Sequence, residues 1–270
     1  MSQIATNISI LAAALLVFSF AMASGPPART AAKLVCDAAA DIALEAQDYR
    51  TAVELHRKFL RSGSGKKNAL AHYHLGFAYG MTGNVSEEIS EYRTAVGLGL
   101  NVWDLFLNLG LAYYDQHDLP AATAALGTAV LFGPEHAETH FNLAVVYERE
   151  NRLPEALQEI TKALVLEPKD MDAANTHAII RARMGNLLDA RDIWTQLVRT
   201  APDYAPARSN LAILNRSCAG DCTSFSHLPP PTYLKQRSCP SLRTDSKRLC
   251  MASSRARSSD ALRFSKLARL

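Results

Sequence analysis

Two stretches of the sequence decide the fold: 106-FLNLGLAYYDQHDLPAATAAL-126 and 140-HFNLAVVYERENRLPEALQEI-160. They align without a gap, 34 residues apart, although most of the residues between the matched positions differ. A spacing that is kept while the intervening residues change predicts a repeated packing unit. The matched pairs are Leu109 with Leu143, Gly110 with Ala144, Tyr113 with Tyr147, Pro120 with Pro154 and Ala122 with Ala156.

The same period continues in both directions. A preceding unit begins at Ala69 and a following unit at Met171, each in register. The flanks are degenerate, because the first unit carries about two extra residues near Ser62–Gly65 and the last supplies only a first helix. We therefore predict units at 33–68, 69–102, 103–136, 137–170 and 171–204, with a half unit at 205–215.

Each unit reads as two amphipathic helices joined by a short turn. Asp118 is placed to cap the second helix, and Pro120 suits its first turn. Gly110 predicts a close approach of the paired helices, because the equivalent positions are also small. Prolines end the second helices of the last three full units. These are Pro134, Pro168 and Pro202.

The pattern of a large apolar residue, Leu-Gly, an aromatic residue, alanine and proline resembles the tetratricopeptide repeat over about residues 33–215. The resemblance implies an all-α fold, a right-handed α-solenoid of stacked helix–turn–helix repeats. Three positions depart from the pattern and are expected to loosen local packing without changing the register: Glu88, His177 and Arg181.

The resemblance also implies a groove on the concave face, lined by the first helices. Asparagines recur there at one position, and in superhelical members of the family such a row binds the backbone of an extended peptide. The alternative is that asparagine at this position only caps or solvates the helix. The candidate groove residues are Tyr73, His74, Leu107, Asn108, Leu111, Phe141, Asn142, Val145 and Asn210.

Three acids also recur at one first-helix position, namely Asp104, Glu138 and Asp172. They argue against a basic clamp for a carboxylate terminus. They are expected either to favour a basic partner or to stabilise the positive end of a helix. His72 and His74 lie two apart on one helix and diverge, so we expect packing or surface roles for them and for His140 rather than a metal site.

The chain contains no nucleophile elbow, phosphate loop or paired zinc motif, so the sequence predicts no enzyme, no catalytic residue, no cofactor and no metal. Residues 33–215 carry 17 Lys and Arg against 23 Asp and Glu, which argues against a nucleic-acid platform. No small-molecule substrate is evident.

The two ends differ from the body. Residues 1–23 read as a signal peptide, with an apolar run at 8–22 and small residues at Ala21 and Ala23; an uncleaved membrane anchor is the alternative.

Residues 216–270 are basic and contain 11 serines, so we expect disorder. That tail would bind an anionic surface, or it is a frame-shifted end. Four of the five cysteines lie there without zinc spacing.

The sequence therefore predicts a non-catalytic scaffold that binds a protein or peptide partner in a cell-envelope or secreted complex. Two alternatives stay open. One is the repeat module of an enzyme complex, such as a polysaccharide or glycosyl-transfer system. The other is an assembly factor anchored in a membrane by residues 8–22. Localisation is expected to be periplasmic or secreted, with the anchored form as the alternative.

Overall fold

The computed structural model describes residues 37–63 and 65–217. The expected export segment, all five cysteines and residues 218–270 of the tail lie outside the described residues. Within the described part of the chain the structure is all α-helical and contains no strand, which confirms the predicted fold class. None of these helices is both long and apolar enough to span a membrane.

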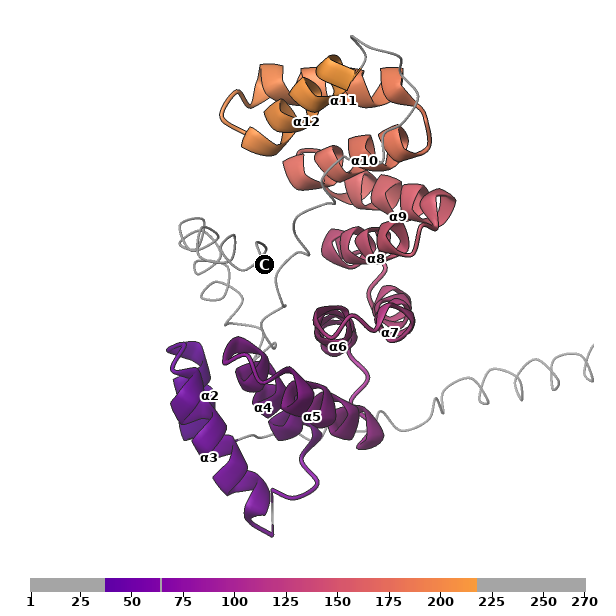
Figure 1. The fold of residues 1–270 in the computed structure, drawn as a ribbon. Coiled ribbons are helices and arrows are strands. Elements are labelled where there is room, and N and C mark those ends of the chain that lie inside the picture. The colour runs from indigo at the N-terminus through magenta and orange to yellow at the C-terminus, as the bar shows by residue number, and fades with distance from the viewer. Residues whose placement is uncertain (1–36, 64, 218–270) are drawn as a thin grey trace, which may run out of the picture. The chain divides into compact units, whose positions relative to one another are not determined.

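The helices form successive pairs, and each pair packs against the next (Figure 1). Unit 1 comprises α2 (Ala38–Glu45) and α3 (Tyr49–Arg61), and unit 2 comprises α4 (Ala69–Met81) and α5 (Val85–Gly97). Unit 3 comprises α6 (Trp103–Asp115) and α7 (Leu119–Phe132), and unit 4 comprises α8 (Ala137–Arg149) and α9 (Leu153–Leu166). Unit 5 comprises α10 (Met171–Arg183) and α11 (Leu187–Thr200), and α12 (Ala205–Ser217) follows.

A side-chain cap marks the start of α7, and prolines follow the ends of the last three second helices. The Asp118 carboxylate accepts a hydrogen bond from the backbone N–H of Ala121 at 3.1 Å, and Pro120 lies in the first turn of α7. Pro134 lies two residues beyond the end of α7, and the prolines after α9 and α11 take the same place. The predicted cap and the predicted helix ends are confirmed.

The turn inside each unit shows the repeat in the backbone itself. One residue per turn has a positive φ, and these residues recur 34 apart from unit 2 to unit 5. In unit 1 the equivalent residue precedes its counterpart by 36, which places the two extra residues between α3 and α4. The residues are Gln47 (φ 61°), Gly83 (81°), His117 (63°), Asn151 (60°) and Gly185 (87°).

The paired helices approach closely at Gly110, as predicted. A Cβ atom on Gly110 would lie 2.6 Å from Cγ of Leu126 in α7, well inside van der Waals contact. In unit 2 the expected loosening at Glu88 is offset by a second glycine. Glu88 is fully buried, and a Cβ atom on Gly80 would collide with its carboxyl group. Gly80 therefore makes room for the larger residue.

Candidate partner-binding site

The nine residues predicted to line the groove all lie in first helices or in α12, and all are buried, with at most 3% exposed. The apolar members belong to the packed core. Tyr73, Leu107 and Leu111 lie in one cluster, and Phe141 and Val145 lie in another. In this structure the residues are covered, so partner binding through them stays a prediction.

The asparagine position links adjacent units. The Asn108 side-chain N–H donates to the Tyr73 hydroxyl at 3.1 Å, 35 residues earlier. Asn210 makes the corresponding bond to the side-chain oxygen of Asn175 at 3.0 Å, again 35 residues earlier. The indole N–H of Trp194 donates to the same oxygen at 2.9 Å. These buried asparagines therefore join neighbouring first helices, a role that neither sequence interpretation included.

Tyr73 continues this polar contact. Burial, and then the nearby Asp104 carboxylate, raise the pKa of the Tyr73 phenol well above its usual value. The neutral hydroxyl donates to Asp104 and accepts from Asn108, so it uses both of its hydrogen-bonding capacities. The bond ties α4 to α6 across two units.

The three recurring acids all lie in the first turns of their helices, as the helix-end interpretation requires. Asp104 is 4% exposed and partnered by Tyr73. Asp172 accepts a hydrogen bond from the Tyr204 hydroxyl at 2.6 Å, from the loop before α12. Asp104 therefore contacts the preceding unit, and Asp172 contacts the loop that leads to α12.

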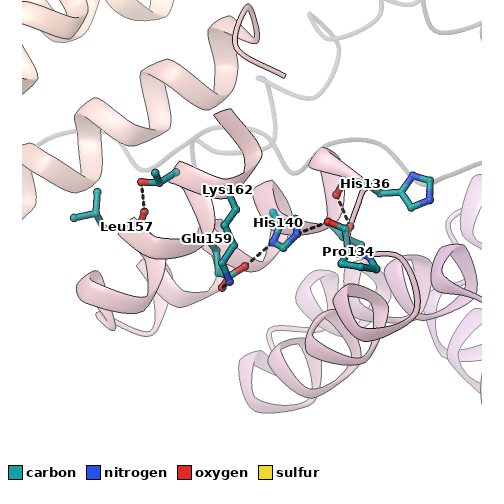
Figure 2. A network of polar contacts seen from close by, with 8 residues as sticks. Pro134, His136, His140, Leu157, Glu159 and Lys162 are labelled. Carbon is teal, nitrogen blue, oxygen red and sulfur yellow. Dashed lines mark hydrogen bonds and ion pairs between the residues drawn. The ribbon is translucent and has the colours of Figure 1, made fainter. Parts of the chain in front are cut away.

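His140 forms a buried network in unit 4. Figure 2 shows its ring between Glu159 and the carbonyl of Pro134. Nδ1 lies 2.6 Å from the Glu159 carboxylate and Nε2 lies 2.9 Å from the Pro134 oxygen, while Lys162 reaches the other Glu159 oxygen at 2.7 Å. Because both ring nitrogens face acceptors, the protonated imidazole is favoured.

The pKa shifts in this network agree with its geometry. The hydrogen bond to Glu159 raises the pKa of His140, although burial opposes the shift. Burial would raise the pKa of Glu159, but the hydrogen bonds from His140 and Lys162 outweigh it and lower that pKa. His72 and Glu91 form the same contact in unit 2 at 2.5 Å. Both histidines have structural partners, as expected for packing roles.

A second histidine cluster lies where α2, α3 and α4 meet. Nδ1 of His74 is 2.8 Å from the Asp41 carboxylate, and Nε2 of His56 is 3.9 Å from the same oxygen. The two imidazole rings are edge-to-face, with centroids 5.5 Å apart. The sequence analysis considered His74 only beside His72, from which it diverges, and missed His56, because His56 lies on the preceding unit. We call Asp41, His56 and His74 the buried triad after its two fully buried histidines; the Asp41 side chain is 25% exposed.

Two pairs of large apolar side chains are exposed near the carboxyl ends of second helices. Leu131 is 82% exposed and Phe132 is 50% exposed at the end of α7. Val165 and Leu166 occupy the equivalent positions of α9 and are 74% and 39% exposed. Sequence reasoning passed over them, although their equivalence one period apart was visible. We call these four residues the apolar end pairs.

Two open depressions lie on the surface of the described residues. One, of about 530 Å³, is bordered by α5 and by Gln116 after α6. The other, of about 610 Å³, follows the loop 167–172. Neither is lined by any of the nine predicted groove residues.

Comparison with known proteins identifies the repeat. The family model described as tetratricopeptide repeat matches residues 38–99 and 107–174. No curated protein sequence matches the chain. Among solved structures, YrrB, described as a TPR protein with an unusual peptide-binding site, is 22% identical, with a TM-score of 0.58 over 63% of this chain and 87% of its own.

Two further structures show the same fold. MamA is 19% identical, with a TM-score of 0.56 over 62% of this chain and 90% of its own. A tetratricopeptide repeat protein from Parabacteroides merdae is 20% identical, with a TM-score of 0.61 over 67% of this chain and 71% of its own. The helix pairs, their 34-residue register and these matches lead to one conclusion: the chain belongs to the tetratricopeptide repeat family.

Proposed function

We propose that this protein is a non-catalytic scaffold that binds a protein partner through side chains presented by successive repeats. Family membership supports this role, since tetratricopeptide repeats generally serve as protein-interaction modules. The similarity to YrrB, whose description names a peptide-binding site, supports a peptide-like ligand.

The apolar end pairs are the observation that carries the proposal. Large apolar side chains that recur at one exposed position in consecutive units leave apolar surface in water, and a partner that covers this surface gains binding free energy. Covering a Leu or Val side chain contributes about 1.5–3 kcal/mol. Leu131 and Val165, the two most exposed, therefore offer a partner substantial binding free energy.

The asparagine positions offer a second way to bind the same class of partner. Asn108 is held by its bond to Tyr73, so its amide would meet a peptide backbone without further loss of side-chain freedom. Asn108 and Asn142 are covered in this structure, so a partner that uses them has to gain access to both.

Reconstituted binding tests the two surfaces separately. Chemical crosslinking and mass spectrometry first identify a partner, and calorimetry then measures its affinity for each variant. Leu131→Ser with Val165→Ser should raise Kd by roughly 100-fold or more, since each lost contact is worth about 1.5 kcal/mol at least. The matched control is Ile42→Ser with Leu188→Ser, two residues that are 65% and 66% exposed elsewhere on the chain. An unchanged Kd for the first variant would refute the proposed surface.

The groove residues need a separate variant. Asn108→Ala with Asn142→Ala should weaken binding at an unchanged melting temperature if the amides contact the partner. A lower melting temperature with unchanged affinity would show that these asparagines stabilise the contacts between units and do not bind the partner. Intact binding and intact stability together would exclude both roles.

We also propose an exported setting, in which residues 1–23 act as a cleaved signal and the scaffold serves a cell-envelope or secreted complex. The support is the apolar run at 8–22 followed by Ala21 and Ala23. Amino-terminal sequencing of the mature protein should begin at Ser24. An intact amino terminus in a membrane fraction would instead support the anchored assembly factor. A glycosyl-transfer enzyme among the crosslinked partners would favour the enzyme-complex alternative.

A further inference from the structure

Two members of the buried triad, Asp41 and His56, replace apolar packing that the other units keep. With the two-residue offset of unit 1, the position of Asp41 corresponds to apolar residues in units 2 to 5, and so does the position of His56. At the first position these are Phe77, Leu111, Val145 and Ile179, and at the second they are Tyr92, Leu126, Ile160 and Trp194, all buried.

Polar groups at these positions need a compensating interaction. Burying a polar side chain costs free energy unless it is paired, and both histidines of the triad are fully buried. His74 uses Nδ1 in its bond to Asp41, while its Nε2 is buried with no hydrogen-bond partner among the described residues. As a set of hydrogen bonds, the cluster therefore leaves His74 only half satisfied. Nδ1 of His74, which faces Asp41, gains a lone pair for a metal ion when its proton moves to Nε2.

The separations fit such an ion. One ligand atom from each of the three residues lies within 4.8 Å of the other two. Zinc binds imidazole nitrogen at about 2.0–2.1 Å and carboxylate oxygen at about 2.0–2.2 Å, so the edges of a tetrahedral site are about 3.3 Å long. The Asp41 oxygen lies 2.8 Å from Nδ1 of His74 and 3.9 Å from Nε2 of His56, on either side of that value. An ion bound at these atoms would replace the hydrogen bond between Asp41 and His74.

We propose that Asp41, His56 and His74 bind one Zn²⁺ ion, which ties unit 1 to unit 2. Two imidazoles and one carboxylate are donors that zinc accepts, and a water molecule would complete the coordination. The Asp41 side chain is 25% exposed and gives the ion a path from solvent. This site was not expected from the sequence, which indicated no metal.

The repeat supplies the variants that test the site. His74→Asn introduces the residue found at the equivalent positions 108, 142 and 210, and His56→Leu introduces the residue found at position 126. Both are suited to the fold yet remove an imidazole. His72→Gln is the matched control, because His72 lies two residues from His74 on the same helix and pairs with Glu91 instead.

The experiment uses the full chain, stripped with a chelator and titrated with Zn²⁺ in calorimetry, with bound metal counted by mass spectrometry. One equivalent should bind, and binding should persist when all five cysteines are changed to serine. The ion should raise the melting temperature by about 5 °C at a 100-fold excess over Kd. Either triad variant should weaken binding by more than about 100-fold, since loss of outer-shell partners alone costs 10–100-fold. His72→Gln should bind like the unmutated chain.

Cobalt gives a readout that needs no triad variant. Co²⁺ bound to the unmutated chain should show visible absorption of a tetrahedral site without a thiolate charge-transfer band. Failure to bind one equivalent, equal affinity in His74→Asn and His56→Leu, or loss of binding only in the cysteine-free chain would each overturn the proposal. The triad would then be a hydrogen-bonded cluster without metal.

Discussion

The contact between Gly110 and Leu126 gives the sharpest test of the repeat packing. A methyl group added at Gly110 would lie 2.6 Å from Cγ and 3.0 Å from Cδ2 of Leu126, and 3.3 Å from its backbone nitrogen. The last distance means that the helix α7 itself must move, not only the side chain. Gly127 lies in the interior of the same helix, and a Cβ atom there would meet nothing within 4 Å.

These surroundings predict opposite effects for one chemical change. Replacing a helical glycine by alanine gains about 0.5–1 kcal/mol from the backbone, and overpacking a core costs about 1–3 kcal/mol. Gly110→Ala should therefore destabilise the protein by about 1 kcal/mol net, and Gly127→Ala should stabilise it by about 0.5–1 kcal/mol.

Urea unfolding followed by far-ultraviolet circular dichroism measures both variants. With a slope of about 2 kcal/mol/M, the two midpoints should differ by roughly 1 M. Unit 4 holds Ala144 at the position of Gly110 and Ile160 at the position of Leu126, both fully buried. Leu126→Ile should therefore recover at least about 0.5 kcal/mol of the Gly110→Ala loss. Stabilisation by Gly110→Ala, or strict additivity with Leu126→Ile, would refute the close approach of these helices.

Three further perturbations follow from described contacts. His140→Phe, which copies residue 106 of unit 3, should reduce stability most between pH 4.5 and 6.5. The raised pKa of His140 gives stability that is present below 6.5 and lost as pH rises through the folded value. The lowered pKa of Glu159 gives stability that is lost as pH falls below 4.5. Thermal melts of His140→Phe and the unmutated chain across this pH range would show the window. A difference in melting temperature that does not change with pH would contradict it. Asp118→Ala removes the cap of α7 and should cost about 1 kcal/mol in urea unfolding, whereas Asp118→Asn should cost little. Arg183→Met leaves the Glu148 carboxylate, which is 2% exposed, without the cation that reaches it from α10. This change should lower the free energy of unfolding by about 3 kcal/mol. Hydrogen exchange would measure it as a loss of protection in α8 and α10.

The sequence alone determined the register and the fold class. Helix starts, proline ends and the Asp118 cap depend on residues within one turn of each other, so their signals are local. The small residue at Gly110 can also be predicted. Each unit keeps a small residue where its two helices approach closely, and from unit 2 onward these residues recur every 34 positions. Five copies of one constraint make a weak pattern unambiguous.

Only the tertiary structure decided what the polar residues of the first helices do. Whether Asn108 faces a groove or a neighbour depends on the helix of the adjacent unit, and its described partner is Tyr73, 35 residues away. The buried triad depends on the same fact, since Asp41 and His74 are 33 residues apart and belong to different units. A repeat period states which positions are equivalent, but each unit is covered by a neighbour with different side chains. Burial and polar pairing are therefore set by contacts between units, which no single repeat contains.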